Sequence, residues 1–442
     1  MSKYIIHGGK SLQGSVRLGG AKNASYKLMI ASLLADCKGE SRLLNFSHIE
    51  DVKITRDVID SLGGVTRNAG ERTIFINACD LKTAVIRDEF GPKSRASTMF
   101  IPVLLHRFGR ASVPLPGGDK IGKRSLGRHF EGLEAMGAKI RLSNNRIEAE
   151  TKQLIGTEYE FEKNSHTGTE TLLMTAVLAK GKTVLKNAAQ EPEVDDLIEL
   201  LNLMGGRIRR RPGKVIEIVG VDHLEPTIFK IMPDRNEAVS YAVAALVTKG
   251  DIIVENANPE HLSAFLDKLE EINAGYEIGK YGIRFYYKGP LIAADMETQS
   301  HPGFMTDWQP LWTVLVTQAK GDSIVHETIF PSRFQHVEGL NKLGANIEYT
   351  PLEVTKPDNV YNFDTSDKDL LDLPHAVTVH GPTSFQPQTL EVYDLRSGAT
   401  FTIAALAAKG KTILEKVELI NRGYESFADR LISMGADITT ID

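Results

Sequence analysis

One unit recurs six times along the chain, and this internal repetition limits the folds that the sequence can adopt. Each copy has an alanine-rich apolar stretch, a short turn, a β-branched run, an amphipathic stretch and a small-residue turn before another apolar run. Clear copies start at Ala176, Val316 and Ala405, and weaker ones at Ala31, Leu104 and Ala245. The turn residues Gly137, Gly205 and Asn273 follow one another at intervals of 68 residues. A strand-and-helix unit of this length is too long for a solenoid repeat and predicts a small α/β subdomain.

The last copy is longer than the others. The interval from Asn273 to Gly344 is 71 residues, whereas that from Gly344 to Gly435 is 91. The extra residues are polar and lie near Pro351 to Pro374. This pattern predicts a surface insertion.

Composition excludes several classes of protein. The 442 residues include 52 Lys and Arg against 57 Asp and Glu, so the net charge of −5 provides no general attraction for nucleic acid or an anionic membrane. No signal peptide and no apolar run of membrane-spanning length are recognisable, which predicts a cytoplasmic protein. Cys37 and Cys79 cannot form a disulfide scaffold, and the 12 histidines show no metal-ligand spacing, so we expect no metal and no cofactor. The oligomeric state is not readable from the sequence.

Charged residues stand where the alanine-rich helix of each repeat should begin. The six places are Lys22-Asn23, Arg95-Ala96-Ser97, Thr169-Glu170, Asp234-Arg235, Thr306-Asp307 and Asp394-Leu395-Arg396. A cation at a helix N-terminus opposes the macrodipole by roughly 0.3–1 kcal/mol, yet four of these sites carry one. A bound anion would remove this conflict, although solvated cations just outside the helix would also explain it.

Three further arginines fall in loops that follow the predicted strands, namely Arg124, Arg333 and Arg422. One loop arginine is usually a surface residue. Together with the helix-start cations, these three predict a cleft rich in positive charge. Such a cleft suits a substrate with several phosphates or carboxylates.

Five separated motifs then identify a family. They are GGAKNASYKLMIASLLA, LPGGDKIGKR, EPEVDDLIELLNLMGG, PGFMTDWQP with ETIFPSRF, and DLRSGAT with NRGYE. In this order and over nearly the whole chain, they resemble the UDP-N-acetylglucosamine 1-carboxyvinyltransferases, a family of enolpyruvyl transferases. These enzymes catalyse the first committed step of peptidoglycan precursor synthesis.

The resemblance implies an α/β fold of two domains, each an inside-out α/β barrel of three βαβαββ units. Domain 1 would combine residues 1–21 with 232–442, and domain 2 would span 22–231 and carry an active-site loop near 114–124. The family's active site lies in the cleft between the domains, which closes around ligand. The six repeats agree with this fold independently.

The resemblance also implies the reaction. The enolpyruvyl group of phosphoenolpyruvate is transferred to the 3-hydroxyl of UDP-N-acetylglucosamine by addition and elimination, with release of phosphate. Asp307 matches the aspartate next to the sugar hydroxyl, so we expect it to be the base. The alternative is an N-cap carboxylate on a helix that begins at Trp308.

The other matched residues divide by ligand. Lys22, Arg124 and Arg422 match the cations that bind phosphoenolpyruvate, and Asp394 and Arg396 match residues lining the catalytic cleft. Positions around the nucleotide sugar are matched by Asn23, Arg95, Ser165, Thr167 and Arg333. We expect Lys22 and Arg396, with Asp119 and Asp307, to be catalytic.

Asp119 is the departure with the most chemical content, because the family usually has cysteine there. An aspartate can still transfer a proton if its pKa rises from the ordinary value of about 3.9. A carboxylate attacks an epoxide poorly, so we expect insensitivity to fosfomycin, the epoxide that alkylates the family's cysteine. The alternative is a turn residue after Gly117-Gly118.

Other departures concern the acceptor. Ser125, Gly127 and Arg128 differ from the family where the uridine is contacted, and His166 and Thr167 differ beside the diphosphate. Two alternatives follow: an enolpyruvyl transferase for another nucleotide or nucleotide sugar, and a catalytically silent paralogue that binds a nucleotide sugar.

Two further features of the sequence are interpreted as structural. Glu170 is expected at a helix start, without a role in the reaction. Trp308 and Trp312, at i and i+4, are expected to pack in the core.

Overall fold

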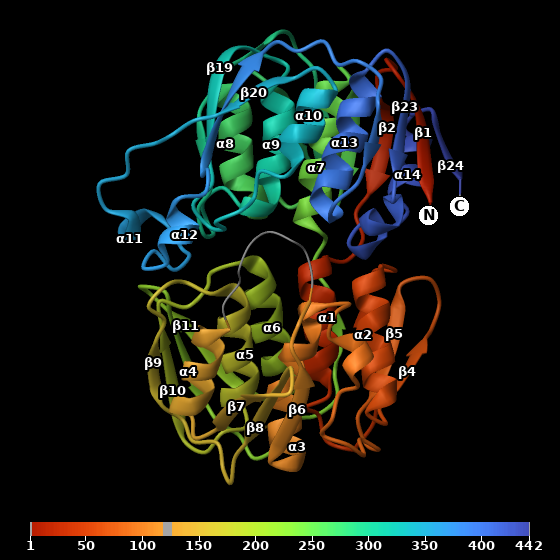
Figure 1. Cartoon of the computed structure of the whole chain (residues 1–442). Helices are drawn as coiled ribbons and strands as arrows, with labels where there is room; N and C mark the ends of the chain where they lie inside the picture. The colour runs from red at the N-terminus through yellow and green to blue at the C-terminus, as the bar shows by residue number, and fades with distance from the viewer. Residues whose placement is uncertain (1, 118–125, 442) are drawn as a thin grey trace. The chain divides into compact units, whose positions relative to one another are not determined.

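The computed structural model describes residues 2–117 and 126–441, which form two compact units (Figure 1). The first unit contains residues 2–18 and 233–441, and the second contains 19–117 and 126–232. The chain therefore passes between the units after Leu18 and after Met232. The sequence-based boundaries lie at residues 21/22 and 231/232. Asp119, Arg124 and Ser125 lie outside the described residues.

Three sheets form in the first unit. In order across each sheet, their strands are β2 (Gln13–Arg17), β14 (Asp251–Glu255), β16 (Gly282–Tyr286) and β15 (Gly275–Gly279); β17 (Leu291–Ile292), β19 (Ala319–His326), β21 (Ala376–Gly381) and β20 (Asn346–Tyr349), with β18 (Met296–Glu297) beside β19; and β22 (Thr389–Glu391), β23 (Gly410–Glu415), β1 (Lys3–Gly8) and β24 (Ile438–Ile441). The strands from the two chain ends, β1 and β24, are neighbours in the third sheet, so residues from both ends complete one repeat.

Three more sheets form in the described part of the second unit. Their strands are β13 (Ile228–Lys230), β3 (Ser41–Leu44), β5 (Thr73–Asn77) and β4 (Val65–Asn68); β6 (Arg110–Pro114), β8 (Arg146–Glu150) and β7 (Lys139–Ser143); and β9 (Glu158–Glu160), β10 (Lys182–Lys186), β12 (Val215–Val219) and β11 (Arg207–Arg211).

All six sheets share one pairing scheme. In five of them an edge strand pairs parallel with the next strand. Beyond that pair, each following strand pairs antiparallel with its neighbour. In the sheet of β6, a single parallel bridge between Val85 and Ser112 stands where the others have that edge strand. The chain therefore has a mixed α/β fold in which the sheets share one arrangement of parallel and antiparallel strands.

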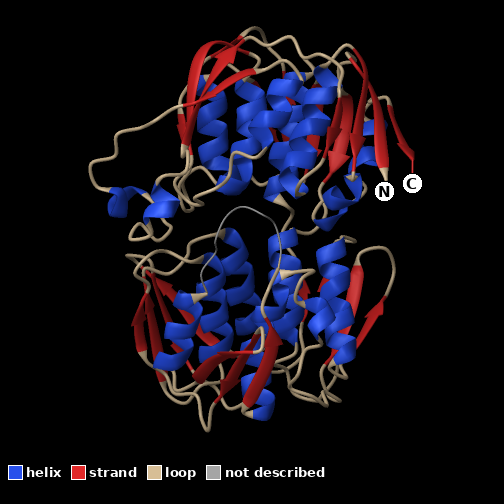
Figure 2. Cartoon of the chain, in the orientation of Figure 1, coloured by secondary structure: helices blue, strands red, loops and turns tan. Residues whose placement is uncertain are grey.

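Each repeat contributes one almost fully buried helix, and we call these the inner helices. They are α7 (Arg235–Val247), α9 (Gln309–Val316) and α13 (Leu395–Ala407) in the first unit, and α1 (Lys22–Ser32), α3 (Ile101–Phe108) and α5 (His166–Ala176) in the second. Two begin as 3-10 turns, η4 (Thr306–Trp308) before α9 and η2 (Arg95–Phe100) before α3. Figure 2 shows that the sheets lie on the outside of each unit, with helices between them.

A second helix in each repeat is buried on one face only. These helices are α8 (Ser263–Glu271), α10 (His336–Lys342), α14 (Phe427–Ser433), α2 (Glu50–Ser61), α4 (Gly127–Ala135) and α6 (Pro192–Leu203). Glycine allows two of them to approach an inner helix closely. A Cβ on Gly339 of α10 would lie 2.3 Å from Phe401, and one on Gly132 of α4 would lie 2.4 Å from Leu172.

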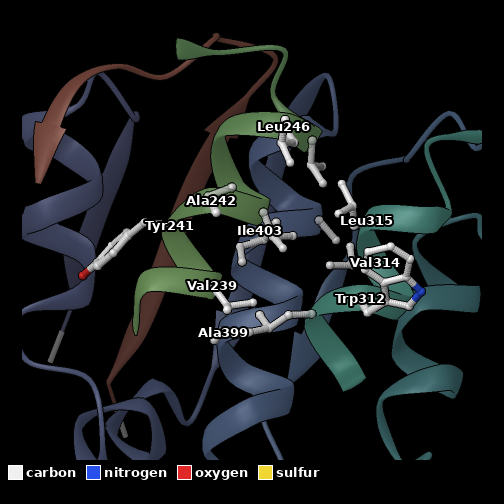
Figure 3. Packing of buried hydrophobic residues seen from close by; sticks show 14 of the residues in the cluster. Val239, Tyr241, Ala242, Leu246, Trp312, Val314, Leu315, Ala399 and Ile403 are labelled. Carbon is white, nitrogen blue, oxygen red and sulfur yellow. The ribbon is translucent and has the colours of Figure 1, made fainter. Parts of the chain in front are cut away.

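Apolar side chains of the three inner helices meet in the core of the first unit (Figure 3). Val239, Trp312, Leu315 and Ile403 are completely buried there. Each such side chain contributes about 1.5–3 kcal/mol through removal from water. Trp308 and Trp312 are 1% and 0% exposed, which confirms their predicted packing role.

The repeat register is visible in the backbone. The turn residues after the second helices all have a positive φ: Gly63, Gly137, Gly205, Asn273, Gly344 and Gly435. Glycine and asparagine adopt this conformation at least cost, which explains why they recur at this point of the sequence.

The insertion near Pro351 to Pro374 contains two short helices, α11 (Pro357–Val360) and α12 (Lys368–Leu371), neither with a buried residue. Tyr361 and Phe363 are buried and stack on each other, which anchors the segment. The other short 3-10 elements are η1 (Asp88–Phe90), η3 (Pro259–Leu262) and η5 (Val417–Arg422). Of the helices in the described residues, none is long and apolar enough to cross a membrane.

Candidate active site

Asp307 lies between two arginines in the first unit. Its Oδ1 accepts a hydrogen bond of 2.8 Å from Nη2 of Arg333, and its Oδ2 accepts one of 3.1 Å from Nη2 of Arg396. The two arginine side chains are 5% and 7% exposed, whereas that of Asp307 is 22% exposed. Asp307 is the middle residue of η4, whose N-cap is Met305. The alternative that Asp307 caps a helix beginning at Trp308 is therefore wrong.

The N-terminus of α13 holds Arg396 in place. Asp394 is the N-cap, and its Oδ1 accepts from the backbone N–H groups of Arg396 and Ser397. Ser397 in turn bonds the backbone N–H of Asp394, which completes a capping box. Burial lowers the pKa of Arg396, but Tyr424 and Asp307 outweigh it, so the pKa is raised overall.

A buried carboxylate shapes the loop that carries Arg333. Glu327 is fully buried, and its Oε1 accepts from the backbone N–H groups of Ile329 and Phe330. Its Oε2 accepts from Thr306 Oγ1, the residue before Asp307. Burial raises the pKa of Glu327 despite the nearby Arg333. Glu327 thus joins the Arg333 loop to the η4 turn.

The second unit brings together other predicted residues at the starts of its inner helices. Lys22 and Asn23 are the first two residues of α1, and Lys22 Nζ lies 3.0 Å from Asp51 Oδ2. This ion pair is largely buried, with Lys22 13% and Asp51 6% exposed. The carboxylates of Asp51 and Asp307 already offset helix-start cations. The sequence therefore overestimates the excess of positive charge at these positions.

The start of α5 is a second cluster in this unit. Ser165 is the N-cap, and its Oγ accepts from the backbone N–H of Gly168. In the first turn, Thr167 Oγ1 lies 2.9 Å from His129 Nε2. Burial and the charges of Arg95 and Arg128 lower the pKa of His129 to about 3, so this imidazole is neutral near pH 7. Arg95 is the first residue of η2, the turn that precedes α3.

Glu170 is not at the helix start, because α5 begins at His166 and Glu170 is fully buried one turn later. The prediction of its position was wrong because the capping signal at Ser165 was missed. Glu170 forms an ion pair with Lys27 of α1, whose side chain is 2% exposed. Its Oε1 also lies 3.2 Å from Nε2 of His166.

The predicted residues thus fall into two groups. The first unit holds Asp307, Arg333, Asp394, Arg396 and, at the end of η5, Arg422, whereas the second holds Lys22, Asn23, Arg95, Ser165 and Thr167. Asp119 and Arg124 lie outside the described residues. Asp51, Glu327 and Tyr424 were not singled out by sequence reasoning. The last two lie in the motifs ETIFPSRF and NRGYE, which were the available signal.

Chemically, the Asp307 cluster can accept a proton. An ionised carboxylate is an acceptor, and the two arginine bonds orient both of its oxygens. The α5 start can bind an anion through backbone N–H groups and the helix dipole. Within residues 2–117 and 126–441, no three His, Cys, Asp or Glu side chains group as metal ligands.

Comparison with known proteins identifies the class. A family model described as EPSP synthase (3-phosphoshikimate 1-carboxyvinyltransferase) matches residues 6–431. The solved structure of the enolpyruvyl transferase NikO from Streptomyces tendae has a similar fold, with a TM-score of 0.85 at 20% identity. That match covers 99% of this chain and 98% of the other. The fold and the family match place the chain in the class of enolpyruvyl transferases.

More similar relatives narrow the class. The UDP-N-acetylglucosamine 1-carboxyvinyltransferase of Sorangium cellulosum is 40% identical over 446 residues, covering 100% of this chain and 99% of the relative. The protein of the same name from Desulforapulum autotrophicum is 37% identical over 441 residues, covering both chains completely. The chain belongs to the family of UDP-N-acetylglucosamine 1-carboxyvinyltransferases.

Proposed function

We propose that this protein transfers the enolpyruvyl group of phosphoenolpyruvate to the 3-hydroxyl of UDP-N-acetylglucosamine and releases phosphate. This is the first committed step of peptidoglycan precursor synthesis. Full-length identity of 37–40% to relatives named for this activity carries the proposal.

Asp307 acts as the base in this proposal. Its carboxylate is 22% exposed, while its two arginine partners are buried, so a sugar hydroxyl can approach it from the solvent side. Two hydrogen bonds, one from the Arg333 loop and one from α13, restrict its orientation, which favours proton transfer along a fixed line. Arg333 positions Asp307 and contacts the nucleotide sugar.

The remaining charged residues bind the anionic parts of the substrates. Lys22, Arg124 and Arg422 neutralise phosphoenolpyruvate, and Arg396 stabilises charge that develops during addition. Asp119 transfers the proton at C3 of the enol. The residues that contact the nucleotide sugar are Asn23, Arg95, Ser165 and Thr167. Asp394 caps the helix that carries Arg396. The start of α5 suits a diphosphate because helix N-termini bind such anions.

We also propose that each unit is an inside-out α/β barrel of three βαβαββ repeats. The shared strand-pairing scheme and the outer position of the sheets support this description (Figure 2).

Phosphate release tests the proposed function. The purified chain is supplied with phosphoenolpyruvate and, separately, UDP-N-acetylglucosamine, UDP-glucose and UDP. We expect release with the first acceptor and little with the others. Release with a different nucleotide alone would refute the proposed acceptor, and no release with any acceptor would support the catalytically silent alternative.

A further inference from the structure

The phenol oxygen of Tyr424 lies between two polar side chains inside the first unit. Arg396 donates a hydrogen bond of 3.0 Å from Nη1 to Tyr424 Oη, and Ser240 Oγ of α7 lies 2.7 Å from the same oxygen. Tyr424 is 1% exposed and Ser240 is completely buried. Neither residue is needed for the proposed chemistry, so their position next to Arg396 requires an explanation.

The direction of each hydrogen bond follows from the number of protons. Ser240 has one hydroxyl proton, which it donates to the carbonyl oxygen of Asn236 at 2.8 Å. Tyr424 must therefore donate its own proton to Ser240 while it accepts from Arg396. This orientation is the one that satisfies all three bonds.

The chain of bonds continues to the base. The side-chain Oδ1 of Asn236 accepts a bond of 2.9 Å from Nε1 of Trp308, the residue after Asp307. Asp307 accepts from Nη2 of Arg396, the same guanidinium that donates to Tyr424. The bonds and the Asp307–Trp308 peptide link close a ring. The ring joins the starts of α7, η4 and α13 and, through Tyr424, the residues that follow η5.

We infer that Tyr424 is a positioning residue for the reaction: it fixes the plane of the Arg396 guanidinium so that Nη2 faces the carboxylate of Asp307. The inference rests on the proposed function for its kinetic consequence only. Tyr424 stands two residues after Arg422, so the same contact also ties the Arg422 turn to α13. Small displacements of catalytic groups cost about 10²-fold in rate.

The test compares Tyr424→Phe with wild type. The phenylalanine keeps the aromatic ring, whose centroid lies 4.7 Å from that of Phe427, and removes only the hydroxyl. We expect kcat to fall on the order of 10- to 100-fold with little change in KM, because substrate-binding groups other than Arg396 are retained. The matched control is Tyr276→Phe, which removes an exposed hydroxyl bonded to Glu270 and should leave kcat unchanged.

A double-mutant cycle separates positioning from packing. If Tyr424 acts through Arg396, its effect should disappear in an Arg396→Lys background, since the guanidinium to be oriented is gone. Equal effects of Tyr424→Phe in both backgrounds would overturn the inference. Ser240→Ala, which removes the acceptor of the Tyr424 proton, should lower kcat in the same direction, and an unchanged kcat would also count against the ring.

A readout without turnover keeps the inference distinct from the proposed function. Inactivity of the wild-type protein would refute the function, yet crystal structures of wild type and Tyr424→Phe would still test the positioning. We expect the contact between Arg396 Nη2 and Asp307 Oδ2 to be lost in the variant. Its retention with unchanged geometry would overturn the inference.

Discussion

Replacement of Lys27 by methionine should markedly destabilise the second unit. The Lys27 ammonium is 2% exposed and forms an ion pair with the Glu170 carboxylate, which is 0% exposed. Removal of one partner of a buried pair costs about 3–5 kcal/mol, because the other charge remains buried without it. Since His166 still contacts Glu170, we expect the lower end, about 3 kcal/mol. The melting temperature should then fall by roughly 6–12 °C.

Differential scanning calorimetry measures the change in melting temperature, and two further variants test its cause. Lys38 pairs with Glu225 on the surface of the same unit, with side chains 61% and 57% exposed, so Lys38→Met should leave the transition unchanged. The double variant Lys27→Met with Glu170→Leu should recover most of the loss, because no unpaired charge remains. Equal melting temperatures for Lys27→Met and Lys38→Met would refute the reasoning.

The same cluster predicts a pH dependence of stability. Burial lowers the pKa of His166, but the Glu170 carboxylate more than offsets this, so the pKa is raised above 6.5. A raised pKa means that the folded state binds the proton more tightly than the unfolded state. The stabilisation is therefore complete below about pH 6.5 and is lost as the pH rises through the folded-state pKa. Glu170→Gln should weaken this dependence, and an unaltered profile would contradict the assignment.

Three further predictions concern single side chains. Asp307→Asn should lower the rate of phosphate release by about 10²–10⁴-fold, while calorimetric binding of UDP-N-acetylglucosamine persists. The control Asp322→Asn, at an exposed carboxylate, should leave the rate unchanged. Equal rates for the two variants would exclude Asp307 as the base. The protein should stay active after incubation with fosfomycin and Asp119→Cys should become sensitive, so rapid inactivation with label on Asp119 would refute the account. A hydrogen bond with Cys37 raises the pKa of Cys79 to about 11, so maleimide should label Cys79 slowly at pH 8 and faster after Cys37→Ala; identical rates would disprove the contact.

The repeat architecture was predictable because it is encoded locally. Turn residues that need a positive φ, such as Gly137 and Asn273, recur at one place in each unit and mark its register. If the 3-10 turns η2 and η4 are counted as the starts of α3 and α9, five of the six helix starts lie within a residue of the predicted places. The exception is α5, which begins three residues before Thr169. Its N-cap, Ser165, is hard to recognise in the sequence because the acidic residue that would complete a capping box is absent.

The contacts within the candidate site were harder to predict from the sequence. Asp307, Arg333 and Arg396 come from three separate segments, and no spacing rule links them. The repeat pattern marked them as charged candidates, but the family resemblance alone assigned them to one site. The ion pair of Lys27 and Glu170 joins two inner helices of different repeats. A lysine in an alanine-rich helix gives no sign that it is buried, because its burial depends on how the repeats pack.

The product formed in heavy water tests the central claim most directly. The wild-type chain is incubated in D₂O with phosphoenolpyruvate and UDP-N-acetylglucosamine, and the nucleotide product is analysed by NMR and mass spectrometry. Addition and elimination predict a carboxyvinyl ether on the sugar 3-oxygen, with deuterium in the vinyl methylene and an equal amount of phosphate. Phosphate without that ether, or an ether that contains no deuterium, would contradict the account.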